Sequence, residues 1–146
     1  MTSRLKITKI LLNEKTDDEY IFLGIVSSEA DYKLSQLLNK KLKLALKNSK
    51  PLDIAGNNGE KMSFSRYSFT FVSPEISYNL ISNRSGKDYL LKKLKKIDYF
   101  FLVHHNENYC NIELIINAIR EIEKITAVFR LDPKGIKDKY LVYLTP

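Results

Sequence analysis

The stretch LLKKLKKIDYFF, residues 90–101, carries residue types that bind polyanions. Its ammonium groups are those of Lys92, Lys93, Lys95 and Lys96. Lysines bind phosphates electrostatically, and a neighbouring ring such as that of Tyr99 stacks on a nucleobase. The residue types therefore suggest a contact with RNA or another polyanion.

The same stretch also fits a structural role. Leu91 anchors a turn on the core in this interpretation, while the lysines keep their charges in water because their long stems reach outward. Ile97 and Tyr99 alternate as on the buried face of a strand, and Asp98 accepts hydrogen bonds from a neighbouring loop. We favour this structural interpretation over polyanion binding.

A second basic run lies between residues 40 and 50. Its members are Lys40, Lys41, Lys43, Lys47 and Lys50. If the fold places this run beside Lys92–Lys96, affinity for a single strand should fall with salt, with a slope of about −0.7 per phosphate neutralised. The net charge of +7 suits such a patch, but it also keeps an ordinary protein in solution.

One cluster has side chains of the types that bind metals. It consists of His104, His105, Glu107 and Cys110. Zinc sites are typically built from paired ligands at spacings such as CxxC or HxxxH, which this cluster lacks. We therefore predict no metal and no other cofactor, and we expect Asn108 or Asn111 to cap the helix that follows.

Motifs for catalysis and for nucleotide binding are missing. The sequence has no GxSxG elbow, and GNNGEK is followed by no GK[ST]. The aromatic segment RYSFTFVS lacks the glycine pattern of RNA-recognition strands, so Tyr67, Phe69 and Phe71 are expected to line one face of an ordinary strand. We assign no catalytic residues, although an enzyme built from scattered residues stays a third alternative.

Length and composition indicate one soluble domain. The chain has 146 residues, of which 44% are hydrophobic and 28% charged, and this length is enough for a sizeable core. A single cysteine agrees with a reducing compartment, and no apolar run suggests a signal or a membrane span. We predict a cytoplasmic domain over residues 1–146, with a polar C-terminal tail from about residue 133.

The first half of the chain predicts a hairpin followed by a helix. Strands are expected at 5–12 and 20–26, with a turn at 13–19. A helix starts with a serine N-cap in the segment 27–31 and ends near Lys41. The alternating leucines of 41–47 then favour a strand, with one continuous helix as the alternative. Pro51 and the glycines place a loop at 48–61.

The second half predicts a mainly antiparallel sheet. Strands are expected at 66–73, 76–83, 97–103 and 125–131, with a turn at 84–88 and an added edge strand at 140–144. Residues 111–122 form an amphipathic helix. Short turns between strands give an α+β class with two principal helices and a mainly antiparallel sheet.

From Leu91 to Tyr99 the sequence resembles the IPExxxVDY family of the Bacteroidetes. Residues 97–99 fit the Val-Asp-Tyr end of its motif, Leu91 stands for the isoleucine, and Lys92 and Lys93 replace the proline and glutamate. The segments GIVSSEADYKLSQLLNK, LISNRS and FRLDP are also similar and follow in the same order. The resemblance implies a small cytosolic protein, and it brings no activity and no catalytic residues.

These observations predict a non-enzymatic binding module that engages a protein partner. The chain offers no catalytic motif, while its aromatic and basic residues are available for a surface. The alternative is a basic protein associated with RNA through the two lysine runs. Exposed edge strands would also allow a homodimer, and no contact with a membrane is expected.

Overall fold

The computed structural model describes residues 19–56, 58–72, 75–105 and 111–144. The strand predicted at 5–12 and nearly all of the turn at 13–19 lie outside the described residues. The rest folds into two α-helices and a six-stranded sheet in the order β2-β3-β4-β7-β1-β8. Every pair of neighbours in this sheet is antiparallel, which confirms the predicted α+β class.

The elements have the following bounds. The large sheet contains β2 (Lys47–Ala55), β3 (Lys61–Val72), β4 (Glu75–Ser82), β7 (Tyr99–His105), β1 (Glu19–Val26) and β8 (Ala127–Arg130). The helices are α1 (Asp31–Leu42) and α2 (Ile112–Arg120). A small hairpin pairs β5 (Arg84–Ser85) with β6 (Asp88–Tyr89), and the short 3-10 helices are η1 (Lys92–Leu94), η2 (Pro133–Gly135) and η3 (Lys139–Tyr143).

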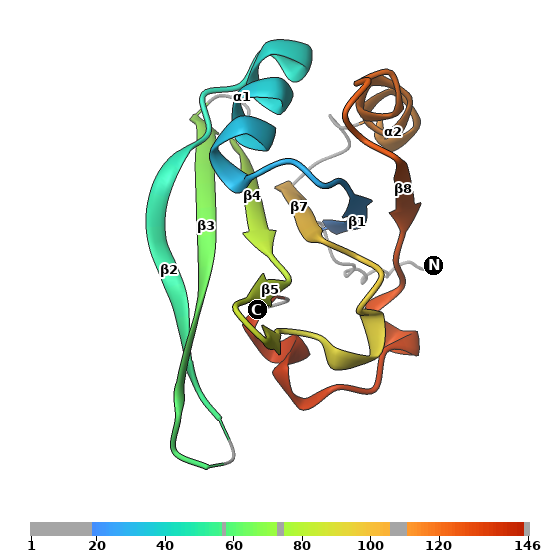
Figure 1. Cartoon of the computed structure of the whole chain (residues 1–146). Helices are drawn as coiled ribbons and strands as arrows, with labels where there is room; N and C mark the ends of the chain where they lie inside the picture. The colour runs from blue at the N-terminus through green and yellow to red at the C-terminus, as the bar shows by residue number, and fades with distance from the viewer. Residues whose placement is uncertain (1–18, 57, 73–74, 106–110, 145–146) are drawn as a thin grey trace, which may run out of the picture.

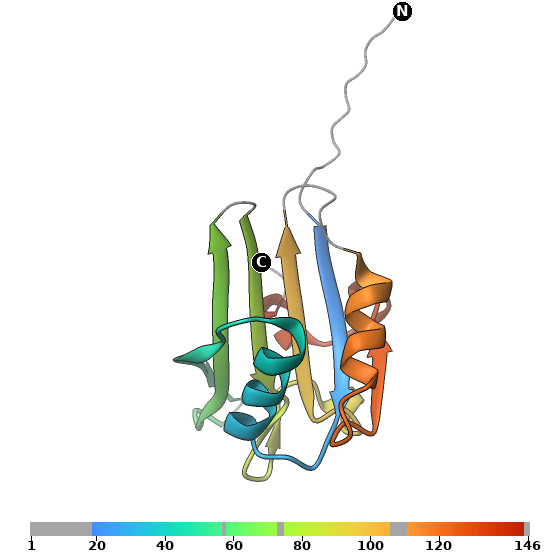
Figure 2. The same cartoon turned by 90° about the horizontal axis from the view of Figure 1, so that it is seen from above.

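Both faces of the sheet are packed, although by different kinds of element. Helices α1 and α2 cover the first face, α1 over the β3–β4 side and α2 over the β1–β8 side (Figure 1 and Figure 2). Ile116 and Ile119 of α2 enter the first core together with Leu23 and Leu34. The β5–β6 hairpin and the three 3-10 helices lie below the second face in Figure 1.

The second core is built mainly from aromatic and aliphatic side chains that alternate with those of the first. It contains Phe22, Ile54, Met62, Phe64, Ile81, Leu90, Leu91, Ile97, Phe100, Leu102, Tyr140 and Leu144. Each central strand therefore contributes to both cores, because successive side chains point to opposite faces. This burial on both sides explains the nearly continuous apolar run of β7.

The predicted serine cap of α1 was wrong. The N-cap residue is Ala30, which makes no side-chain capping bond. The Ser27 hydroxyl instead donates to the carbonyl oxygen of Lys124 at 2.8 Å and accepts from the Glu29 N–H at 3.2 Å. Ser27 is therefore used to join the start of α1 to the loop that follows α2.

Neither interpretation of residues 41–47 was correct. Helix α1 ends at Leu42 because Lys43 adopts a left-handed conformation with φ 59°, and β2 begins only at Lys47. The Asn39 side chain accepts from the Leu46 N–H at 2.7 Å and donates to the Leu46 carbonyl at 3.1 Å. The Asn39 amide thus satisfies backbone groups of Leu46 that a neighbouring strand would otherwise pair with. Leu42, Leu44 and Leu46 alternate because the segment between α1 and β2 packs against the first core.

The loop predicted at 48–61 was also wrong, since most of it is the edge strand β2. Pro51 is tolerated because β2 lies at the edge and its pairing with β3 is interrupted between Ser49 and Leu52. Ile54 is the one fully buried residue of this strand, so its composition is that of a loop. The true turn follows β2, where Gly59 has φ 77°.

The edge strand predicted at 140–144 was wrong as well. Residues 139–143 form η3, and Asp138 caps it by accepting from the Tyr140 N–H at 2.9 Å. Tyr140 and Leu144 are buried in the second core. The segment predicted as a polar tail thus packs below the sheet within the part of the chain that the structure describes.

Candidate ligand-binding pocket

Lys40, Lys41 and Lys43 of the first lysine run lie on the opposite side of the sheet from the second run, so the two runs as a whole do not form one patch. Lys40 and Lys41 are in the last turn of α1, Lys43 caps that helix and Lys47 starts β2. Lys92, Lys93, Lys95 and Lys96 are exposed on and after η1, below the other face (Figure 1). The condition for one polyanion site spanning both runs is therefore not met.

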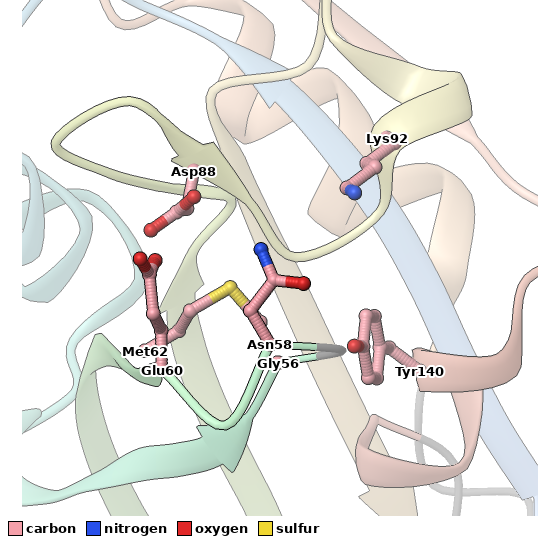
Figure 3. Close-up of a pocket in the computed structure, with 7 residues that line it drawn as sticks. All are labelled: Gly56, Asn58, Glu60, Met62, Asp88, Lys92 and Tyr140. Carbon is pink, nitrogen blue, oxygen red and sulfur yellow. The ribbon is translucent and has the colours of Figure 1, made fainter.

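Lys92 also has negatively charged neighbours. It lines a pocket of about 180 Å³ together with Asn58, Glu60, Asp88 and Tyr140. In Figure 3 the carboxylates of Asp88 and Glu60 point toward each other, and Lys92 lies across the pocket from them. Two carboxylates near this lysine oppose the approach of a phosphate.

The stretch 90–101 is anchored by Asn83, a fully buried residue that the sequence did not single out. The Asn83 side chain donates to the carbonyl oxygens of Leu94 and Ile97, both at 2.9 Å. Its Oδ1 accepts from the Leu91 N–H at 2.8 Å. Leu91 and Ile97 are buried as predicted, but Ile97 lies in the second core and Tyr99 in the first, so the two do not share one strand face.

Asp98 and Tyr99 join β7 to the segment before α1. Asp98 accepts from the Ser27 N–H at 2.9 Å and from Arg84 at 3.2 Å, which confirms the hydrogen bonds expected from a neighbouring loop. The Tyr99 hydroxyl donates to the Glu29 carbonyl at 2.6 Å. Burial, helped by the nearby carboxylates of Asp31 and Asp98, raises the pKa of Tyr99 to about 12.

The histidines of the suspected metal cluster lie on opposite faces of β7. His104 stacks on Tyr20 at 4.2 Å between ring centroids on the second face, whereas His105 is the next residue along the strand and is buried. Consecutive strand residues cannot direct their side chains at one ion. Glu107 and Cys110 lie outside the described residues. Asn111 caps α2 by accepting from the Leu114 N–H at 3.3 Å, as predicted.

A polar pocket of about 260 Å³ lies on the second face, at the end of the sheet near Tyr20. It is lined by Tyr20, Arg66, Ser77, Asn79, Ile81, Leu102, His104, Tyr143 and Leu144. Strand pairing explains this convergence, because Ser77 lies opposite His104, which also lies opposite Tyr20. Asn79 is opposite Leu102, where the apolar part of this face begins.

Arg66 gives this pocket its charge. Among the residues that the structure describes, Arg66 is the one lysine, arginine, aspartate or glutamate that lines the pocket. Its Nε is buried and makes no hydrogen bond within those same residues. A buried donor without an acceptor costs about 1–3 kcal/mol, so an acceptor supplied by a ligand would stabilise this side chain.

The C-terminal segment forms an apolar wall of the same pocket. Tyr143 and Leu144 line it, and Val142 precedes them on η3. Val142 is 66% exposed and Tyr143 47% exposed, whereas Leu144 is buried. The pocket thus combines a cationic group, neutral hydrogen-bonding side chains and an exposed apolar rim, which is typical of a site that binds another molecule.

The sequence analysis missed this pocket, although β3 contains a partial signal for it. The aromatic face was predicted correctly at Tyr67, which is buried, and Phe69, which packs against the first core. Arg66, Ser68 and Thr70 alternate with these aromatic residues along β3, and this alternation indicates a polar second face. The residues that complete the pocket come from other strands and from η3, so no local pattern contains them.

Comparisons of the chain with known proteins found no match. No family model matches the chain, and neither a curated protein nor a solved structure matches it. The resemblance to the IPExxxVDY family therefore stays a prediction. Neither helix within the described ranges is long and apolar enough to cross a membrane.

Proposed function

We propose that this protein is a non-enzymatic binding module that engages a protein partner through the polar pocket and its rim. The observation that carries the proposal is the position of the exposed Tyr143 on a wall of the pocket that contains Arg66, with the exposed Val142 next to it in η3. Apolar and aromatic side chains around a half-buried arginine are features that supply binding energy at protein interfaces.

Association with RNA is the weaker alternative. Binding a strand requires cations that follow one continuous track along its phosphates. Lys40, Lys41 and Lys43 lie with α1 on the first face, Lys92–Lys96 lie below the second face, and Lys92 shares a pocket with Glu60 and Asp88. These placements favour a protein partner over RNA.

Affinity capture from the cells that produce the protein tests the proposal. The wild type is compared with a variant that carries both Val142→Ser and Tyr143→Ser, at low and high salt and with and without ribonuclease. Because the rim is mostly apolar, a defined protein should be retained by the wild type at high salt after ribonuclease treatment. The double variant should retain at least tenfold less of that protein than the wild type does.

Leu114→Ser is the matched control. Leu114 is 65% exposed, so its replacement removes exposed apolar surface from α2, which covers the first face and lies away from the pocket. This variant should retain the partner. Equal retention by the rim variant and the wild type would contradict the proposal. Recovery of RNA alone, lost at high salt, would favour the RNA alternative.

A further inference from the structure

We infer that the polar pocket binds a single carboxylate group, and that Arg66 is its principal ligand-binding residue. This inference rests on the proposed function and specifies the chemistry of the partner. The group has two sources, an acidic side chain of a protein segment or a free carboxylic acid. The rim favours the first source, since a peptide also covers Val142 and Tyr143.

The sign of the ligand charge follows from the lining residues. No aspartate or glutamate is among the described residues that line this pocket, so Arg66 has no carboxylate neighbour there. Two other arginines have partners within the protein: Arg84 pairs with Asp98, and Arg120 donates to the Val128 carbonyl. A guanidinium between low-dielectric walls attracts an anion more strongly than one in water.

The type of anion follows from the number of cations. Among the described lining residues, the Arg66 guanidinium is the one group with a permanent positive charge, and it lies with the imidazole of His104 and the neutral groups of Ser77, Asn79, Tyr20 and Tyr143. A guanidinium matches a carboxylate through two parallel hydrogen bonds, and one positive charge balances one negative charge. A phosphate dianion would need a further cation or a helix N-terminus, and the pocket is lined by strand residues and η3.

The size of the pocket limits the ligand to a small group. Its volume of about 260 Å³ lies just below the range of roughly 300–1,000 Å³ that is typical of sites for whole small molecules and cofactors. At one edge of the pocket the hydroxyl groups of Ser77 and Thr70 form a hydrogen bond with each other, with 3.2 Å between their oxygen atoms. The space therefore suits one acidic side chain and leaves the rest of its peptide on the rim.

A titration followed by NMR at the arginine Nε–H groups tests the inference. The probes are sodium acetate, inorganic phosphate and the blocked tripeptides acetyl-Leu-Glu-Leu-amide and acetyl-Leu-Gln-Leu-amide, at constant ionic strength. The Arg66 signal, assigned by its loss in Arg66→Gln, should shift with acetate and with the glutamate peptide. The glutamate peptide should bind about tenfold more tightly than acetate, because it adds apolar contact with the rim.

Variants of the pocket and of a control position test whether binding depends on Arg66. Arg66→Gln should abolish binding of the glutamate peptide, while Arg130→Gln, which removes an exposed arginine outside this pocket, should leave it unchanged. Asn79→Leu keeps Arg66 but fills the pocket, so it should also abolish binding and serves if Arg66→Gln does not fold. Circular dichroism reports the fold of each variant.

Three results would overturn the inference. They are the absence of a shift with both acetate and the glutamate peptide, tighter binding of phosphate than of carboxylate, and equal binding of the glutamate and glutamine peptides. Acetate bound as tightly as the glutamate peptide would overturn the peptide source and leave a free carboxylic acid. If the NMR titration fails but capture of a partner still depends on the rim, the carboxylate inference is rejected and the proposed function is kept. If the titration succeeds but no partner is captured through the rim, the protein partner is rejected and the carboxylate site is kept.

Discussion

The side chain of Asn83 and the backbone of Leu91 are joined by a hydrogen bond of 2.8 Å, in which the Leu91 N–H donates to Oδ1. The same amide group donates to the carbonyls of Leu94 and Ile97. One buried side chain thus replaces the strand pairing that the segment between β6 and β7 lacks. The lysines of η1 are presented to water by this arrangement.

Asn83→Ala should destabilise the protein by about 3 kcal/mol. The change removes the acceptor of the Leu91 N–H and the donor to the carbonyl oxygens of Leu94 and Ile97. Each buried group left without a partner costs about 1–3 kcal/mol when water cannot compensate fully. Urea unfolding measures the difference. Asn117→Ala, at an exposed position of α2, should leave the stability within about 0.5 kcal/mol; equal effects of the two changes would contradict the anchoring role.

Gly24→Ala should cost about 1–3 kcal/mol through overpacking. A Cβ atom at Gly24 would lie 2.8 Å from Ile97 Cδ1 and 3.1 Å from Leu131 Cδ1, so buried side chains must move. Gly135→Ala provides the comparison, because nothing lies within 4 Å of the added atom. Thermal unfolding should show a lowered Tm for the first variant and an unchanged or slightly raised Tm for the second. A neutral Gly24→Ala would mean that Ile97 is loosely packed.

Stability should fall as the pH rises from 10 to 12, because the pKa of Tyr99 is raised from 10.0 to about 12 in the folded protein. In this interval the unfolded chain has released the phenol proton and the folded chain has kept it, so ionisation favours unfolding. The contribution of this proton is fully present below pH 10. Tyr99→Phe should reduce the fall, which urea unfolding at several pH values measures against the wild type.

At neutral pH the same variant should lose about 1 kcal/mol, since the hydrogen bond from the Tyr99 hydroxyl to the Glu29 carbonyl is removed. A stability that falls equally in both proteins at high pH would assign the effect to other tyrosines.

Leu144→Ala should destabilise the domain by about 2–5 kcal/mol, as expected for a fully packed leucine. Val142→Ala, two residues earlier and 66% exposed, should change the stability by less than about 0.5 kcal/mol. Chemical denaturation of both variants decides whether η3 belongs to the cooperative unit. A negligible effect at Leu144 would show that the C-terminal segment unfolds separately.

The sequence predicts the central elements because their patterns are dominated by burial. Ile116 and Ile119 follow the period of an amphipathic helix, and β7 lies between two cores, so its apolar run is unambiguous. The edge strand β2 escapes prediction because its residues are mostly exposed and Pro51 is tolerated only at an unpaired or irregular position. Local composition does not reveal which strand lies at an edge.

The pocket and the Asn83 anchor escape prediction for a different reason. Asn83 binds residues 8 to 14 positions away in the chain, and a lone asparagine near a turn has many other uses. Arg66, Asn79 and His104 meet only after β3, β4 and β7 are placed side by side. The polar face of β3 is visible in the alternation, but its partners are set by strand order.

The irregular pairing of β2 also bears on self-association. An outer strand with unpaired backbone groups is a template on which a second chain can add and begin aggregation. In β2 the ladder shifts between Ser49 and Leu52, Pro51 has no N–H to offer, and Lys47 and Lys50 place charge along the exposed strand. A regular row of donors and acceptors is therefore absent from this border of the sheet, and growth of a continuous intermolecular sheet from it is disfavoured.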